Sequence, residues 1–144
     1  MATITKGDTS YISANFTAAE LYSKSPDAPN SHYLSDEVIK GAQIIRDWVG
    51  EPVYINSSYR TAAHNASIGG ASNSQHLVGN ALDLSFKTEN AKNLVINDIA
   101  TKGQLYQKLK FNAIRGFGLY DNFVHIDSRT ATNPVIWDNR KKKS

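Results

Sequence analysis

The chain has 144 residues, 40% of them hydrophobic, a formal net charge of +3 and no cysteine. These values suit a single domain with a real hydrophobic core, and they exclude disulfide bridges and thiolate metal sites. No stretch approaches the ~18 to 20 apolar residues of a membrane span, and the N-terminus lacks the charged and apolar regions of a signal peptide. We therefore expect a protein that is made in the cytoplasm without a signal peptide and does not insert into a membrane.

The two ends of the chain carry little functional information. Residues 1–13 are polar, and we expect them to be loosely held. Residues 139–144 form a basic tail that accounts for the charge excess, and we expect it to be solvated rather than bound to a specific partner. No nucleic-acid-binding motif accompanies the tail, so we expect no nucleic-acid partner. A single folded domain is then expected over residues 14–138.

Short local patterns between these ends indicate helices and strands. Two prolines make residues 25–30 a loop. A helix follows, with Ser35 as its N-cap and Gly50 as the residue after its last turn, and its apolar residues recur on one face. Residues 52–58 are predicted to form a strand, and residues 61–68 a short helix.

The second half of the chain continues this alternation of elements. It predicts a strand over residues 81–86 and an amphipathic helix over residues 90–100. Residues 115–120 and 123–127 are typical of a β-hairpin with a two-residue turn. Together the elements predict an α+β domain in which helices flank a small antiparallel sheet.

Two segments hold the residues that suggest chemistry. His76 stands seven residues before Asp83 in the first, and His125 lies inside an apolar run in the second. Two histidines and one carboxylate form the ligand set of a catalytic zinc, which leaves the fourth coordination position for water. His76 would enter from a loop that turns at Gly79, and Asp83 from a strand. In the later strand, alternation places His125 and Asp127 on one face. The pattern predicts a zinc hydrolase.

Each histidine taken alone is explained more simply as a hydrogen-bonded side chain near the core. That explanation would have to hold for His76, Asp83 and His125 together, so we favour metal binding for these three. For His32 and His64 we keep the simpler explanation and expect structural or exposed side chains.

Several short motifs in a fixed order support this interpretation. They are Ser58-Tyr59-Arg60, Asn65, Gly69-Gly70, Ser74-Gln75-His76, Gly79, Ala81, Asp83, Gly116-x-Gly118-x-Tyr120 and Val124-His125-Ile126-Asp127. With these motifs the chain resembles the peptidase M15 family over residues 16–129. That family comprises the zinc D-Ala-D-Ala carboxypeptidases and the related phage and bacterial peptidoglycan endopeptidases. The chain is most similar to the short, phage-associated branch, whose members carry a segment much like residues 16–21. The resemblance implies a fold like that of Hedgehog and the D-Ala-D-Ala peptidases.

The resemblance also implies roles for individual residues. The two histidines and the aspartate named above would bind zinc. Arg60 would engage the substrate peptide near the carbonyl under attack, because its planar fork suits a carboxylate or a developing oxyanion. The alternative for Arg60 is an ordinary surface ion pair. Ser74 and Gln75 would hold the loop before His76 or contact substrate, and we favour the structural role.

The general base is the point at which the sequence departs from the family. Peptidases of this kind need a carboxylate that takes a proton from the attacking water and passes it to the leaving amine. The better-known members carry an acidic residue three positions before the last histidine, where this chain has Asn122. An amide cannot transfer the proton. We favour Asp127 as the base, with Asp121 as the alternative and no base at all as the third outcome. Asp127 could instead orient a zinc-bound imidazole.

One expected function and one alternative follow from the resemblance. The first is a zinc-dependent peptidase that hydrolyses an amide bond in the stem peptides or cross-links of bacterial peptidoglycan, as a carboxypeptidase or an endopeptidase. The implied setting is a phage lysin or a virion-associated lysis protein, monomeric, active at the cell wall after release by a partner such as a holin. The alternative is a non-catalytic zinc module that binds peptide or wall, or builds part of a virion.

Overall fold

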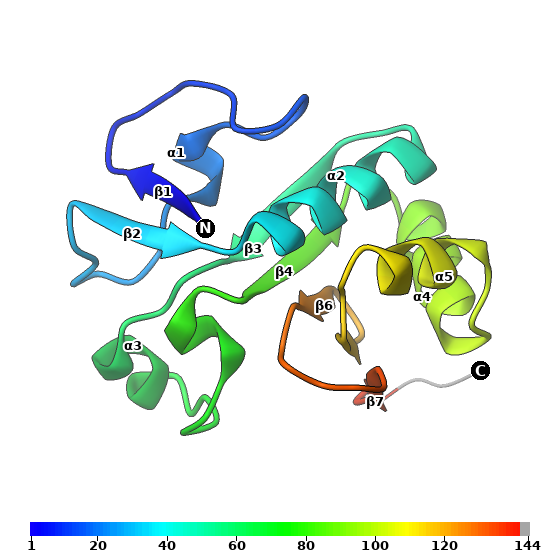
Figure 1. The fold of residues 1–144 in the computed structure, drawn as a ribbon. Coiled ribbons are helices and arrows are strands. Elements are labelled where there is room, and N and C mark those ends of the chain that lie inside the picture. Colours follow the sequence, from blue (N-terminus) through cyan, green and yellow to red (C-terminus); the bar gives the residue numbers. More distant parts are fainter. Residues whose placement is uncertain (142–144) are drawn as a thin grey trace.

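The computed structural model describes residues 1–141 (Figure 1). The last three residues of the predicted basic tail, 142–144, lie outside the described residues. In chain order the elements are β1 (Ala2–Thr5), α1 (Ala18–Leu21), β2 (Ser31–Leu34), α2 (Asp36–Val49), β3 (Val53–Ser57), α3 (Ala62–Ser67), the 3-10 helix η1 (Gln75–Val78), β4 (Ala81–Phe86), α4 (Glu89–Ala100), α5 (Gln104–Phe111), β5 (Gly116–Leu119), β6 (Val124–Asp127) and β7 (Val135–Asp138). The protein is an α+β domain, as its sequence predicted.

A five-stranded sheet forms the centre of the domain. Its strand order is β3-β4-β6-β5-β7, and every neighbouring pair is antiparallel except β5 with β7. The predicted antiparallel sheet is therefore confirmed for four strands, whereas β7, which no sequence pattern revealed, adds a parallel edge. Parallel neighbours usually need a long crossover connection. Here the chain leaves β6 beside the first residue of β5, Gly116, and β7 begins beside the same residue, so a short connection joins β6 to β7.

The N-terminal segment is held more firmly than its polarity predicted. β1 pairs with β2 in a separate two-stranded antiparallel sheet. The side chain of Ile4 is fully buried in the core. The expectation of a loosely held segment is therefore wrong for residues 2–5. Four residues, with Ile4 buried and Ala2 partly buried against the core, are too short a pattern to be recognised as a strand.

Helix α2 begins and ends where its sequence predicted. The hydroxyl of Ser35 accepts a hydrogen bond from the backbone N–H of Val38 at 3.3 Å, and Gly50 adopts a φ of 72° after the last turn. Helices α2, α4 and α5 pack on one another and against the sheet (Figure 1). None of the helices within residues 1–141 is long and apolar enough to cross a membrane.

Alternation along the central strands separates the core from the predicted site. Leu82 and Leu84 on β4, and Val124 and Ile126 on β6, are fully buried in the core. The residues between them project from the opposite face, because successive side chains of a strand point to opposite sides. The predicted site residues of both strands lie on that second face, so the packed core holds them in place.

Candidate metal centre

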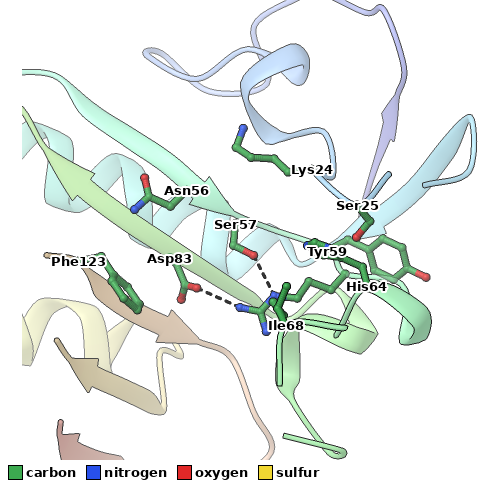
Figure 2. Close-up of a pocket in the computed structure, with 10 residues that line it drawn as sticks. Lys24, Ser25, Asn56, Ser57, Tyr59, His64, Ile68, Asp83 and Phe123 are labelled. Carbon is green, nitrogen blue, oxygen red and sulfur yellow. Dashed lines mark hydrogen bonds and ion pairs between the residues drawn. The ribbon is translucent and has the colours of Figure 1, made fainter. Parts of the chain in front are cut away.

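Two adjoining cavities lie over the predicted site residues. The first, which we call the side cavity, has a volume of about 230 Å³ and is lined in part by Lys24 and His64 (Figure 2). The second, which we call the metal cavity, has a volume of about 470 Å³ and includes His76 in its lining. Arg60 and Asp83 line both, so the two cavities share a wall.

The three predicted ligands converge in the metal cavity. Nε2 of His76 lies 3.2 Å from Oδ1 of Asp83, and Nδ1 of His125 lies 3.0 Å from the same oxygen. All three side chains are buried. Around a tetrahedral zinc with bonds of about 2.0–2.1 Å, ligand atoms lie ~3.3–3.4 Å apart. The donor set and its spacing therefore fit a zinc ion.

Sheet register and one glycine bring these side chains together. Asp83 on β4 and His125 on β6 are direct partners across the sheet. His76 lies on η1, and Gly79 ends that helix with a φ of 73°. A Cβ at Gly79 would lie 2.6 Å from the carbonyl oxygen of Tyr33. Only glycine fits this turn, which leads the chain from η1 into β4 and sets His76 beside Asp83.

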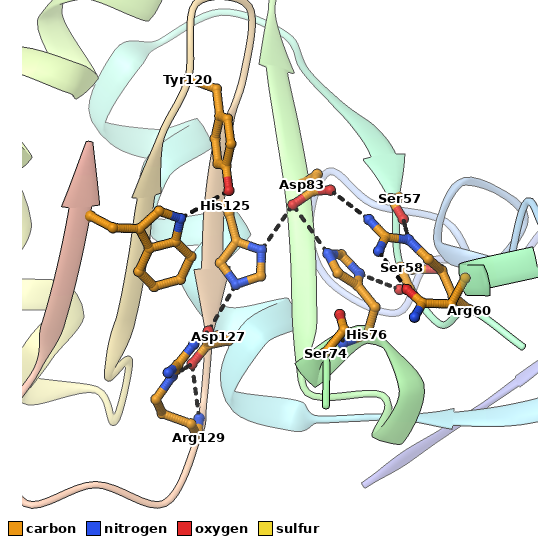
Figure 3. Close-up of polar contacts among 12 residues, drawn as sticks. Ser57, Ser58, Arg60, Ser74, His76, Asp83, Tyr120, His125, Asp127 and Arg129 are labelled. Carbon is orange, nitrogen blue, oxygen red and sulfur yellow. Dashed lines mark hydrogen bonds and ion pairs between the residues drawn. The ribbon is translucent and has the colours of Figure 1, made fainter. Parts of the chain in front are cut away.

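Hydrogen bonds on the outer nitrogens orient both rings (Figure 3). Nδ1 of His76 donates to the carbonyl oxygen of Ser58 at 2.6 Å, and Nε2 of His125 donates to Oδ2 of Asp127 at 2.8 Å. In each ring the nitrogen that faces Asp83 is thereby left as the ligand atom. The surrounding fold thus sets the tautomers that metal binding requires.

The same contacts shift two pKa values. Burial alone would raise the pKa of Asp83, but the rings of His125 and His76, which hydrogen-bond to it when they carry a second proton and a positive charge, hold it well below its usual range. Burial would lower the pKa of His125, but its hydrogen bonds with Asp127 and Asp83 raise it above its ordinary value. The buried carboxylates therefore favour a positive charge at this place, which a proton or a divalent ion can supply.

A comparison with known protein families decides the assignment. The sequence profile of the peptidase M15 family matches residues 14–127, which is well over half of the chain. The chain belongs to the peptidase M15 family. A search among curated proteins finds no match. Because M15 peptidases depend on a metal, the cluster of His76, Asp83 and His125 is the candidate metal centre of this M15 peptidase.

A row of residues across the sheet packs against one ligand of this M15 site. Gly118 on β5 pairs with His125 on one side and with Trp137 of β7 on the other. The Trp137 indole packs against His125 with ring centroids 5.1 Å apart, and a Cβ at Gly118 would lie 2.8 Å from that indole. Gly116 leaves room for the carboxylate of Asp127 in the same way. Both glycines of the motif are therefore required by neighbours of His125.

Arg60 lies in the wall between the cavities, where the resemblance implied a substrate contact. Its Nη2 lies 3.3 Å from Oδ2 of Asp83, while Nε donates to the hydroxyl of Ser57 and Nη1 to the amide oxygen of Asn65. Only 16% of its side chain is exposed. This is no ordinary surface ion pair, because the partner is a buried predicted ligand. A guanidinium carries more N–H donors than these three bonds use, so others remain for a substrate.

Ser74 and Gln75 both line the metal cavity and stabilise the segment around His76. The hydroxyl of Ser74 accepts a hydrogen bond from the backbone N–H of His76 at 3.2 Å, as the N-cap of η1. The backbone carbonyl of Gln75 accepts one from the N–H of Asn80 at 3.1 Å. These bonds agree with the structural role that we favour, and substrate contact by either side chain stays a prediction.

The contacts of Asp127 argue against our favoured role for it as the base. Oδ2 contacts Nε2 of His125, the ring nitrogen that faces away from Asp83, and the guanidinium of Arg129 donates to both carboxylate oxygens at 2.8 Å. The carboxylate is fully buried and does not line the metal cavity. Burial alone would raise the pKa of Asp127, but hydrogen bonds from Arg129 and His125 hold it well below its usual range. The alternative role, orientation of His125, agrees with all of these contacts.

The two residues of the hairpin turn, Asp121 and Asn122, lie outside the described lining of the metal cavity. The N–H of Tyr120 donates to the carbonyl oxygen of Phe123 at 3.2 Å, which confirms the predicted two-residue turn. Asp121 and Asn122 line a third cavity together with Lys92, and neither lines the metal cavity. This placement argues against Asp121 as the base, and it puts Asn122 outside the described lining of the metal cavity.

Tyr120 and Trp137 are site residues to which the sequence assigned no function. Both line the metal cavity, where Nε1 of Trp137 donates to the Tyr120 hydroxyl at 2.8 Å. The hydrogen of that hydroxyl is then directed away from Trp137. Among the described residues that line the metal cavity, Asp83 is the sole carboxylate. Tyr120 stood in a recognisable motif, whereas Trp137 follows the last motif and carried no signal.

Proposed function

We propose that this M15 peptidase is a zinc enzyme that hydrolyses an amide bond in the stem peptides or cross-links of bacterial peptidoglycan. The observation that carries the proposal is the convergence of Nε2 of His76, Oδ1 of Asp83 and Nδ1 of His125. A zinc ion held there would polarise the scissile carbonyl and lower the pKa of a coordinated water from about 15.7 to about 7. Peptidoglycan as the substrate rests on membership of the family.

Arg60 stabilises the charge on the substrate in this proposal. Its guanidinium is held by Ser57, Asn65 and Asp83 and lines the metal cavity. The oxygen of the scissile carbonyl becomes negative as the amide bond is attacked. Donors that are already oriented stabilise that charge without reorganisation. In many hydrolases this stabilisation makes a large contribution to the rate enhancement.

Tyr120 is our candidate for proton transfer to the leaving amine. Its hydroxyl is fixed by Trp137 and its side chain lines the metal cavity. A tyrosine can serve as a general acid or base when it is within reach of the reacting group. With the metal bound, the attacking water would lose its proton to solvent, and Tyr120 would give its own proton to the leaving amine and regain one from solvent. Asp127 acts through His125 in this scheme, as a positioning residue that keeps the imidazole oriented toward the metal.

Digestion of purified peptidoglycan with mass analysis of the products tests the proposal. We expect the zinc-loaded wild type to release fragments whose masses identify one cleaved amide bond, and the variant His76→Ala to release none. Loss of a single terminal residue would identify a carboxypeptidase, and larger fragments an endopeptidase. If no fragment appears from any peptidoglycan tested, the proposed hydrolysis is contradicted.

We further propose a phage setting, as a lysin or virion-associated lysis protein that acts as a monomer. The similarity of residues 16–21 to the short, phage-associated branch supports this setting. Expression in bacteria with and without a co-expressed holin tests it. We expect lysis only when the holin is present, and rapid lysis without a holin would contradict release by such a partner.

A second candidate function is a non-catalytic zinc module that binds peptide or wall. One observation favours it, because the described lining of the metal cavity holds no carboxylate other than Asp83, a predicted ligand. Sedimentation with insoluble peptidoglycan, carried out beside the digestion, distinguishes the candidates. Binding without released fragments supports the module, and released fragments support the enzyme.

A further inference from the structure

The side cavity is rich in positive charge, although none of its cationic side chains is needed to bind the metal. The positive side chains in its lining are Lys24, which Figure 2 labels, and Arg60. Among the described residues that line it, Asp83 is the sole carboxylate, and that group already contacts Arg60 and two histidines. The cavity therefore offers positive charge directly beside the metal centre.

The two serines beside Lys24 fix the backbone that carries it at the edge of this cavity. The hydroxyl of Ser23 donates to the carbonyl oxygen of Tyr59 at 2.5 Å, and the hydroxyl of Ser25 accepts from the backbone N–H of Thr61 at 3.1 Å. Both serines are buried, whereas Lys24 between them is exposed and extends above β3 (Figure 2). The backbone that carries Lys24 is thus attached on both sides to the segment that carries Arg60.

Lys24 has no partner of its own in the part of the chain that the structure describes. No hydrogen bond or ion pair from residues 1–141 reaches its ammonium group. Lys92, by contrast, pairs with Glu89 and donates to the backbone of Asp121. An unpaired ammonium and a guanidinium with unused donors, on the walls of one cavity, are suited to bind a carboxylate.

We propose that the side cavity binds a carboxylate of an acidic peptide, held by Lys24 and Arg60 while a neighbouring amide bond lies at the metal centre. This inference rests on the proposed function and specifies its substrate. The carboxylate can come from the C-terminus of the peptide or from an acidic residue within it. A C-terminal carboxylate would restrict hydrolysis to the bonds nearest the end, whereas an internal one would permit cleavage within the peptide.

The test compares the zinc-loaded wild type with Lys24→Gln, Lys24→Arg and the control Lys40→Gln. Lys40 is exposed on α2 and lines neither cavity. Three synthetic stem pentapeptides of the form Ala-γ-Glu-Lys-Ala-Ala serve as probes. The first has both carboxylates free, the second has the glutamate carboxylate amidated, and the third has its C-terminus amidated. Hydrolysis gives KM and kcat, and calorimetry gives Kd for a peptide that is not cleaved.

We expect Lys24→Gln to raise KM or Kd about tenfold for the peptide with both carboxylates free, with kcat unchanged, because one charge-assisted contact is lost. Lys24→Arg should restore most of the affinity, and Lys40→Gln should match the wild type. Amidation of the bound carboxylate should weaken binding to the wild type and abolish the effect of Lys24→Gln. The peptide that behaves in this way identifies the source of the carboxylate.

Each other outcome rejects a definite part of the inference. Cleavage with equal KM for the wild type and Lys24→Gln, or an equal loss with all three peptides, overturns the carboxylate site and leaves the proposed function intact. Binding that depends on Lys24 without cleavage supports the site and contradicts the hydrolysis. Peptides that the wild type neither binds nor cleaves contradict both.

Discussion

His32 and His125 are both buried side chains on strands, and both have contacts at their two ring nitrogens, but their partners differ. Nδ1 of His32 donates to the carbonyl oxygen of Tyr33, and Nε2 accepts from the backbone N–H of Ser23. The two nitrogens of His125 contact carboxylates instead. The region around β2 therefore holds a histidine with backbone groups, and the centre of the large sheet holds one with negative charge.

The partners decide what each ring can do. Burial lowers the pKa of His32 below 6.5, and its hydrogen bond with the carbonyl of Tyr33 offsets this only in part. The neutral ring stacks on Tyr59 with centroids 5.0 Å apart. At His125, two carboxylates outweigh the same effect of burial and raise the pKa. Burial alone does not identify a functional histidine, whereas buried carboxylates around it do.

We expect the largest effect from replacing a predicted metal ligand, and only a small effect on zinc binding from replacing His32. We expect His76→Ala to lose zinc and activity, and to lower the free energy of unfolding, because the bound metal stabilises the native state. His32→Gln should keep its zinc. Elemental analysis and chemical denaturation measure both effects. Equal zinc content in the wild type and His76→Ala would remove the distinction between the two regions.

Arg60→Lys tests the group that lies between the two cavities. An ammonium cannot reproduce the planar fork, so we expect kcat to fall by roughly 10²- to 10³-fold while zinc content persists. Steady-state kinetics on a soluble stem peptide and elemental analysis check this. Unchanged kcat would mean that Arg60 only pairs with Asp83 and does not stabilise the reacting carbonyl.

Tyr120→Phe removes one hydroxyl and keeps the aromatic ring. If the hydroxyl transfers the proton to the leaving amine, kcat should fall by about 10²-fold, within the range of general acid–base catalysis. Tyr11→Phe, at a side chain that is 70% exposed, is the matched control and should match the wild type. Full activity of Tyr120→Phe would reassign proton transfer to another group.

Asp127→Asn distinguishes positioning from proton transfer. An amide holds the His125 ring less well, so we expect zinc affinity and activity to fall together, each by about 10- to 100-fold. Asp121→Asn should cost little, because Asp121 lies outside the metal cavity. If Asp127 were the general base, Asp127→Asn would lose activity but keep full zinc affinity. That result would restore our first hypothesis for Asp127.

The smallest expected effect concerns pH and the His32 region. Because the folded-state pKa of His32 lies below 6.5, the unfolded chain takes up its proton first as the pH falls. The contribution of His32 to stability is therefore fully present above pH 6.5 and decreases as the pH falls toward the folded-state pKa. Denaturation of the wild type and His32→Gln at pH 5 and pH 8 measures it. Equal losses in both proteins would show that other groups cause the acid destabilisation.

Signals that depend on neighbours in the chain predicted much of this molecule. Helix α2 begins after Ser35 and ends before Gly50 as expected, and the two-residue turn joins β5 to β6. Short patterns failed where a four-residue strand had only Ala2 and Ile4 to identify it, as in β1, and where a strand followed the last motif, as with β7. Local propensity contains too little information to identify such elements before they pair.

The sequence by itself determined the α+β class and the three candidate ligands, because residue type and spacing are sufficient for both. Only the tertiary structure decided what surrounds them. The register of β4, β6, β5 and β7 places Asp83, His125, Gly118 and Trp137 in one row, and Arg129 closes over Asp127. Loops from distant parts of the chain bring Lys24 to the side cavity, which Arg60 also lines. Such contacts depend on how strands align and loops pack, which no local pattern encodes.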